Sequence, residues 1–284
     1  MTIETLSRHA CFGGTVGFYR HEATTTRCTM RFAVFTPPQA ARGKVPVLTY
    51  LAGLTCTEET FMIKAGAQRL AAELGLMLVA PDTSPRGEGV ARAPGGSWDF
   101  GLGAGFYLDA TEPPYAANYR MYSYITQELP ALIAAHFPAD MNRQGIFGHS
   151  MGGHGALTIA LKNPNAYRTV SAFAPIVAPM QVPWGQKAFA GYLGSDRDTW
   201  RDYDATELVK AKDAAYRGRR ILIDQGLADQ FLDRELKSEL FANACHGAGI
   251  DLKLRQHEGY DHGYYFISTF IDDHLRWHAD GLRK

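Results

Sequence analysis

A Gly-x-Ser-x-Gly pentapeptide, Gly148-His149-Ser150-Met151-Gly152, constrains this chain more than any other feature of its sequence. It lies between a short β-prone segment, 144–147, and an apolar segment, 156–161, that reads as a helix. A serine on a sharp strand-to-helix turn is held in a strained, exposed conformation, and the flanking glycines let neighbouring backbone approach closely. The amides at the start of the helix favour negative charge that develops on a substrate. The pentapeptide therefore predicts a nucleophilic serine, in preference to a glycine-rich turn with an incidental serine.

Strands and helices are expected to alternate along most of the chain. Nearly continuous apolar runs at 45–51 and 76–80 are typical of strands buried on both faces. A glycine-rich stretch, 83–114, has little regular pattern, and long irregular segments of this kind are often functional. Further strands are expected at 14–19, 26–35, 144–147, 169–173, 219–223 and 251–256, and helices at 62–74, 119–137 with a kink at Pro130, 156–161, 231–244 and 267–278. This order predicts the α/β class, with a mostly parallel sheet covered by helices on both faces.

Composition narrows the classes of function. The 284 residues suit a single α/β domain spanning residues 1–284, and the 29 basic and 29 acidic residues balance, so neither nucleic acid nor an anionic membrane surface is an expected partner. Residues 1–5 lack the apolar run of a signal peptide, and no apolar run approaches the ~20 residues that span a bilayer. The four cysteines are scattered, which favours free thiols in a reducing compartment and hence a cytoplasmic protein: Cys11, Cys28, Cys56 and Cys245.

A serine nucleophile needs a general base, which a carboxylic acid in turn orients. In proteins with this strand-to-helix turn, called a nucleophile elbow, the three residues follow one another along the chain in the order serine, acid, histidine. His262 lies in the loop after the last expected strand, where its ring is free to reach the serine, so we favour it as the base. His257, at the end of that strand, is the alternative. His274 and His278 fall within the terminal helix, where a solvated or core role is more common, and His246 lies at a helix end.

The acid is expected just after the strand at 219–223. Asp229 lies in the loop that follows this strand, where a carboxylate can reach an imidazole across the sheet edge, so it is favoured over Asp224 at the end of the strand. Asp229 could equally serve as a helix N-cap, since aspartate is a preferred residue there.

The reaction also needs two backbone amides to stabilise an oxyanion. One is expected from Met151, the residue after the serine, and the other from the loop after an early central strand. Gly53 would let this loop turn inward, which leaves the Leu54 amide as the second donor. An ordinary strand-terminating glycine is an equally good interpretation of Gly53 from the local sequence.

Several strings in this chain go beyond a general hydrolase pattern. They are Leu51-Ala52-Gly53-Leu54-Thr55-Cys56-Thr57-Glu58, Ser97-Trp98-Asp99-Phe100-Gly101, Gly105-Phe106-Tyr107, Gly148-His149-Ser150-Met151-Gly152-Gly153-His154-Gly155, Pro183-Trp184-Gly185 and Gly259-Tyr260-Asp261-His262. In these strings the sequence resembles the S-formylglutathione hydrolases, also called the esterase D family, and the resemblance extends from about residue 5 to residue 280. One departure is Ala93-Pro94-Gly95-Gly96, where members of the family often carry acidic residues.

This resemblance implies an α/β-hydrolase fold and hydrolysis of S-formylglutathione to glutathione and formate, the second step of glutathione-dependent formaldehyde removal. It assigns Ser150 as nucleophile, Asp229 as acid and His262 as base, with Leu54 and Met151 as the oxyanion amides. It is compatible with a homodimer, and it implies neither a cofactor nor a metal, for which no cluster of ligand residues is evident. The alternatives are a general short-chain carboxylesterase and a catalytically inactive α/β-hydrolase that serves as a binding protein.

Five residues are candidates for lining the substrate pocket. Cys56 follows the expected oxyanion loop, either as an accessible thiol or as a small buried residue, and His149 adjoins the nucleophile. Three aromatic residues could wall the pocket or lie in the core: Trp98, Phe106 and Trp184.

Overall fold

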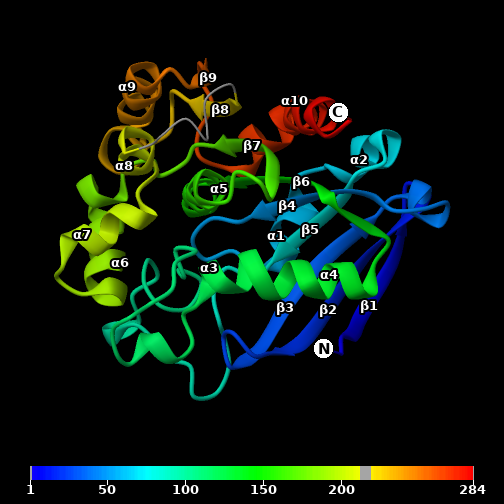
Figure 1. Ribbon diagram of the computed structural model, residues 1–284, viewed down its shortest axis with the longest axis horizontal. Helices are drawn as coiled ribbons and strands as arrows, with labels where there is room; N and C mark the ends of the chain where they lie inside the picture. Colours follow the sequence, from blue (N-terminus) through cyan, green and yellow to red (C-terminus); the bar gives the residue numbers. More distant parts are fainter. Residues whose placement is uncertain (1, 212–218, 284) are drawn as a thin grey trace.

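Nine strands form one sheet in the part of the chain that the computed structural model describes, residues 2–211 and 219–283. Their order across the sheet is β1-β2-β3-β5-β4-β6-β7-β8-β9, and Figure 1 shows this sheet running through the molecule between its helices. The strands are β1 Glu4–Cys11, β2 Gly14–Ala23, β3 Cys28–Thr36, β4 Val45–Leu51, β5 Met77–Pro81, β6 Ala139–His149, β7 Tyr167–Phe173, β8 Arg220–Gly226 and β9 Asp251–His257.

The sheet has an antiparallel part and a parallel part. Strands β1, β2, β3 and β5 pair antiparallel, whereas β5, β4, β6, β7, β8 and β9 pair parallel. In the parallel part, Leu51 lies opposite Gly148, and Phe173 lies between His149 and Asp224. The carboxyl ends of β4, β6, β7 and β8 therefore meet at one edge of the sheet, where open α/β sheets bind their ligands.

Helices cover both faces of this sheet. The α-helices are α1 Glu58–Lys64, α2 Gln68–Leu74, α3 Met121–Ser123, α4 Leu129–His136, α5 Met151–Lys162, α6 Pro183–Leu193, α7 Arg197–Trp200, α8 Ala205–Lys210, α9 Ser238–Ala248 and α10 Tyr264–Leu282. Ser171 on β7 contacts α10, and the next residue, Ala172, lies under Gly153 of α5. Successive residues of a strand point to opposite faces, so α5 and α10 lie on opposite faces of the sheet. The predicted α/β-hydrolase class is confirmed.

Burial explains which strands the sequence revealed. Every residue of β5 and all but one of β4 and β8 are buried, in keeping with their continuous apolar runs. Strand β1 was not predicted, because it is an edge strand that pairs only with β2 and most of its residues are exposed. Three helices between 183 and 210 were also missed: α6, α7 and α8.

Two predicted helices are each interrupted by a residue in the left-handed region. The segment 62–74 forms α1 and α2, separated near Gly66 at φ 70°. The segment 231–244 forms a π-helical turn, Leu232–Leu236, and then α9, with Lys237 at φ 50° between them. A left-handed residue cannot continue a right-handed helix, so each prediction joined two elements that the backbone keeps apart.

The predicted kink at Pro130 takes the form of a π-helical turn, Tyr124–Glu128, between α3 and α4. Proline has no amide to donate and clashes with the preceding turn of an α-helix. The wider π turn comes immediately before α4, with the Leu129 amide bonded to the Tyr124 carbonyl five residues back, so the helical path continues past the proline.

A chain of buried polar side chains ties α10 to strands β7 and β8. His278 bonds to Thr169 at 2.6 Å and to Ser171 at 2.8 Å, and Ser171 bonds to His274 at 2.8 Å. The far nitrogen of His274 lies 3.3 Å from Asp224. His274 and His278 are therefore core residues, which decides between the solvated and core roles that the sequence left open.

Buried histidines are expected to make the protein sensitive to mild acid. Burial lowers the pKa of His154 from 6.5 to about 4 and that of His278 well below its usual value. The unfolded chain takes up these protons near pH 6.5, whereas the folded chain does not, so the free energy of unfolding should decrease as the pH falls below 6.5. His154 alone predicts a loss of roughly 2 kcal/mol between pH 7.5 and pH 5.

Urea unfolding at the two pH values measures this loss. Returning the sample to pH 7.5 should restore the original midpoint, which separates titration from irreversible damage. Equal or greater stability at pH 5 would contradict the burial of these neutral rings.

No helix in the described ranges is both long and apolar enough to cross a membrane.

Candidate active site

Ser150 occupies the sharp turn between the end of β6 and the start of α5. Its backbone has φ 59° and ψ −120°, a conformation that side-chain-bearing residues rarely adopt. The turn is fixed by two hydrogen bonds, from the Ser150 amide to the Phe173 carbonyl at 3.0 Å and from the Ile176 amide to the Ser150 carbonyl at 3.2 Å. Strain at a serine that the surroundings hold in place is the geometry expected of a nucleophile.

The two glycines of the pentapeptide are required by close backbone contacts. A Cβ atom on Gly152 would lie 1.9 Å from the Leu51 carbonyl oxygen, and one on Gly148 would lie 2.2 Å from the Gly152 carbonyl oxygen. These contacts press the turn against the end of β4, so Ser150 lies next to the loop that follows β4.

The structure brings His262 and Asp229 together. The Nδ1 atom of His262 lies 2.5 Å from Oδ2 of Asp229. The other carboxylate oxygen of Asp229 accepts the Phe231 amide at 2.8 Å, and the Gln225 side chain donates to Oδ2 at 3.3 Å. Three hydrogen bonds therefore hold the Asp229 carboxylate in place. The bond to Nδ1 orients the His262 ring and leaves Nε2 free to act as the base.

The alternative pair, Asp224 and His257, lies elsewhere. Arg255 donates to both carboxylate oxygens of Asp224, at 2.6 and 2.5 Å, and the His257 ring stacks on Phe270 with its Nε2 atom 3.5 Å from Asp224. Burial raises the pKa of Asp224, but hydrogen bonds from His274 and Arg255 outweigh burial and lower it to about 2. Asp224 is thus engaged in structural contacts.

The loop after β4 lies against the nucleophile. A Cβ atom on Gly53 would be 3.2 Å from the Cβ atom of Ser150 and 3.2 Å from Nδ1 of His149. The loop is anchored by Thr55, whose amide donates to the Gly103 carbonyl at 2.9 Å and whose φ is 67°. Met151 is the first residue of α5, so its amide has no acceptor within the helix. Leu54 lines the same cavity as Ser150, and Met151 is the next residue in the chain, so both remain the predicted oxyanion donors.

Replacing Gly53 with alanine should lower kcat about tenfold or more, because the new methyl group displaces the loop or Ser150 by a few tenths of an ångström. Initial rates on p-nitrophenyl acetate measure this. Gly247→Ala is the matched control, since its added methyl group meets nothing within 4 Å. A Gly53→Ala variant with the wild-type kcat would show that the loop has no part in catalysis.

A small cavity of about 210 Å³ opens onto Ser150 and His262. Trp98 and Trp184 meet edge to face with ring centroids 5.6 Å apart, and Trp184 lies 4.7 Å from the Phe231 ring. Trp98 is 54% exposed, which places it at the mouth of the cavity. The cavity is lined by Gly53, Leu54, Cys56, Trp98, His149, Ser150, Trp184, Phe231, His262 and Tyr264.

Four of the five predicted pocket residues line this cavity, and Phe106 does not. Phe106 is fully buried, and its carbonyl oxygen accepts a hydrogen bond from His154 at 3.0 Å, so the prediction for Phe106 was wrong. Sequence reasoning missed Phe231 and Tyr264, which each lie two residues after a predicted catalytic residue. That proximity in sequence was the available signal.

His149 and Cys56 have surroundings that limit what they can do. Burial drives the pKa of His149 well below its usual value, and the neighbouring His262 lowers it further. The two rings are 4.4 Å apart, and no side chain among the described residues forms a hydrogen bond with either nitrogen of His149. Burial raises the pKa of the Cys56 thiol, which disfavours the reactive thiolate.

Within the described residues, no group of three or more His, Cys, Asp or Glu side chains is arranged to hold a metal ion.

The site combines a serine on a strained strand-to-helix turn, a histidine fixed by a carboxylate and a loop that packs against the serine. Together these features define a serine hydrolase with the α/β-hydrolase fold. Residues 23–277 match the family model described as "Putative esterase". The chain belongs to the S-formylglutathione hydrolase family within this group of esterases.

The relatives that establish the family match over nearly their whole length. S-formylglutathione hydrolase from Mus musculus is 56% identical over 99% of both chains, and that from Paracoccus denitrificans is 53% identical over 99% of both. The solved structure of an S-formylglutathione hydrolase from Agrobacterium tumefaciens is 55% identical, has a TM-score of 0.95, and matches 98% of this chain and 99% of its own.

Proposed function

We propose that this chain hydrolyses S-formylglutathione to glutathione and formate through a formyl ester on Ser150. The supporting observation is the pairing of His262 with Asp229 beside a strained Ser150, in a chain whose relatives of 53–56% identity bear that activity in their names.

In the first half of the proposed reaction, Ser150 attacks the thioester carbonyl while His262 takes its proton. The carbonyl oxygen becomes negatively charged, and the Leu54 and Met151 amides stabilise it. The C–S bond then breaks, and the sulfur leaves as a thiolate that takes the proton from His262. Glutathione is released, and the formyl group stays on the serine oxygen.

In the second half, His262 takes a proton from water, which attacks the formyl carbon. The ester bond to Ser150 breaks, the serine oxygen recovers its proton from His262, and formic acid leaves and releases a proton to solvent to give formate. Asp229 acts in both halves, because its hydrogen bond to Nδ1 keeps Nε2 as the base and stabilises the imidazolium that forms in each step.

The size of the cavity favours a small acyl group. A volume of about 210 Å³, walled by Trp184, Phe231 and Tyr264, lies below the roughly 300–1,000 Å³ of typical small-molecule sites. A formyl group fits this space, whereas the glutathione part must extend past Trp98 at the mouth.

We also propose that the protein is cytoplasmic and forms a homodimer. The four cysteines are unpaired, which is usual for proteins of a reducing compartment. Light scattering in solution would check the homodimer.

The ratio of kcat/KM for S-formylglutathione to that for p-nitrophenyl acetate tests the substrate. We expect the thioester to be preferred by a factor of about 100 or more, since remote contacts of the glutathione part add binding energy in the transition state. The acetate ester, which lacks those contacts, serves as the control. A preference for the oxygen ester would make this chain a general short-chain carboxylesterase, and activity on neither substrate would make it a binding protein.

A further inference from the structure

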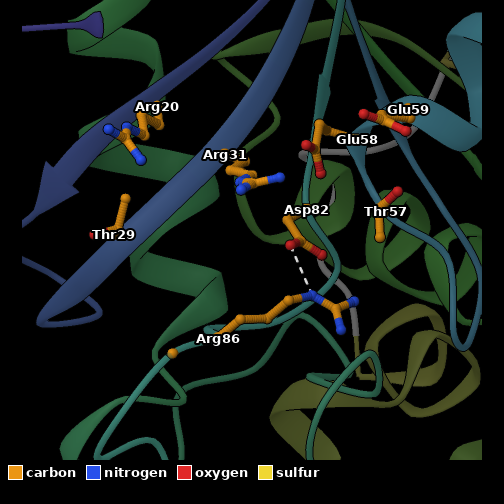
Figure 2. A pocket seen from close by; sticks show the side chains of 9 residues that line it. Arg20, Thr29, Arg31, Thr57, Glu58, Glu59, Asp82 and Arg86 are labelled. Carbon is orange, nitrogen blue, oxygen red and sulfur yellow. Dashed lines mark hydrogen bonds and ion pairs between the residues drawn. The ribbon is translucent and has the colours of Figure 1, made fainter. Parts of the chain in front are cut away.

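A second cavity, the charged pocket, lies on the other side of the segment that follows β4. Its volume is about 490 Å³, within the usual range of small-molecule sites. Gly53, Leu54 and Cys56 face the catalytic cavity, whereas Thr57, Glu58 and Glu59 face the charged pocket. Figure 2 shows that its opposite wall is formed by residues of β2 and β3, with Asp82 and Arg86 below.

Three of the charged residues that line this pocket already have partners: Arg20, Asp82 and Arg86. Arg86 donates through Nε to Asp82 at 2.8 Å and through Nη2 to the Cys56 carbonyl at 3.2 Å. Arg20 forms a paired contact with Glu4, with both nitrogen–oxygen distances at 2.9 Å. These residues build the walls of the pocket and leave little charge free for a ligand.

Glu58 is a buried residue whose carboxylate has no partner on any other described residue. It is only 3% exposed, and the one hydrogen bond to its carboxylate comes from its own backbone amide. Burial and the charge of Asp82 raise the pKa of Glu58, although that amide and the charge of Arg31 oppose this shift. A buried carboxylate with no cation beside it carries a desolvation penalty, which an incoming cation would relieve.

Arg31 faces Glu58 from the opposite wall. Its guanidinium also has no hydrogen bond or ion pair within the described ranges, and Figure 2 shows it turned toward the space between Glu58 and Asp82. Glu59 adds an exposed carboxylate on the same wall as Glu58. The pocket thus presents unpaired negative charge on one wall and unpaired positive charge on the other.

We propose that the charged pocket binds the zwitterionic head of an α-amino acid, with the ammonium group at Glu58 and the carboxylate at Arg31. A simple anion would face the Glu58 carboxylate, and a metal ion would face the Arg31 guanidinium, so neither matches both walls. A free amino acid such as L-glutamate carries this head, and so does the γ-glutamyl end of glutathione. The site shares no lining residue with the catalytic cavity, so the proposal does not rest on the proposed reaction.

Saturation-transfer NMR on the full chain tests the site with L-glutamate, glutathione and N-acetyl-L-glutamate. We expect the first two to bind, and N-acetyl-L-glutamate, which lacks the ammonium group, to bind at least about tenfold more weakly. Glutathione also occupies the catalytic cavity as the product of the proposed reaction, so only binding that Glu58→Gln weakens counts for this pocket. Tighter binding of glutathione than of L-glutamate by that measure would identify the γ-glutamyl peptide as the ligand, and the reverse would identify the free amino acid. If neither L-glutamate nor glutathione binds when present at roughly 10 mM, any dissociation constant is too high for specific recognition, and the proposal is overturned.

Two variants separate this pocket from the catalytic cavity. Glu58→Gln and Arg31→Gln should each weaken binding of L-glutamate about tenfold or more, because each removes one charge-assisted contact. Glu73→Gln and Arg276→Gln, which change exposed residues of α2 and α10, are the matched controls.

Glu58→Gln should also unfold at the same or a higher temperature than the wild type, since it removes a buried charge that no cation pairs with. Unchanged affinity in both pocket variants would place the ligand elsewhere and contradict the proposal.

Discussion

Ser150→Ala is expected to abolish hydrolysis of both thioester and oxygen ester, with kcat reduced by roughly 10⁴-fold or more. The serine oxygen is the atom that forms the covalent intermediate, and the neighbouring Cys56 has a pKa raised by burial, so no other described side chain in the cavity replaces it. The oxyanion amides and the bound geometry account for the residual rate.

The fold should survive this change. Alanine is smaller than serine and keeps its Cβ atom, and the turn is fixed by backbone hydrogen bonds of Ser150 that do not involve the hydroxyl group. The circular dichroism spectrum and the unfolding temperature of the variant should match those of the wild type, because a backbone φ of 59° is as strained for alanine as for serine. Retained turnover in a folded Ser150→Ala protein would refute the assignment of the nucleophile, and Cys56→Ala would then be measured.

Asp229→Asn is expected to lower kcat by about 10⁴-fold while leaving KM within a few fold. An asparagine amide presents an N–H to Nδ1 of His262, which would leave the proton on Nε2, where the base must be free. Steady-state kinetics on p-nitrophenyl acetate across pH 6 to 9 measures the loss. A rate within tenfold of the wild type would remove Asp229 from the mechanism.

Two other aspartates provide matched controls for this variant. Asp233→Asn changes an exposed residue four positions along the chain and should leave kcat unchanged. Asp224→Asn breaks a buried pair with Arg255 and should instead cost stability, about 3–5 kcal/mol by analogy with other buried ion pairs. Together the three variants separate the acid that faces His262 from the acid that holds α10 and β9.

The sequence was sufficient to predict the turn at Ser150 and the two loops on which Asp229 and His262 meet. Strands β4, β5 and β8 are buried on both faces, so their composition is distinctive, and the chain-order rule then leaves few candidates for the acid and base. The choice of Asp229 over Asp224 depended on loop geometry alone. Asp224 is excluded by Arg255 and His274, which approach it from β9 and α10, and local sequence does not reveal such contacts.

The pocket was less predictable than the catalytic residues. Phe106 and Trp98 look alike in the sequence, yet Phe106 is buried against His154 and Trp98 is exposed at the cavity mouth. An aromatic residue is equally suited to a core and to a pocket wall, and only tertiary packing decides between them. The charged pocket was missed for a similar reason, because it joins residues of β2, β3 and α1 that are far apart in the sequence.

Mass spectrometry of the acyl-enzyme tests the proposed reaction most directly. Wild-type protein mixed with S-formylglutathione and quenched in acid within milliseconds should carry one formyl group, on the peptide that contains Ser150. The Ser150→Ala protein under the same conditions should carry none. Product release without a formyl group on Ser150, or with the formyl group on Cys56, would contradict a mechanism through the serine.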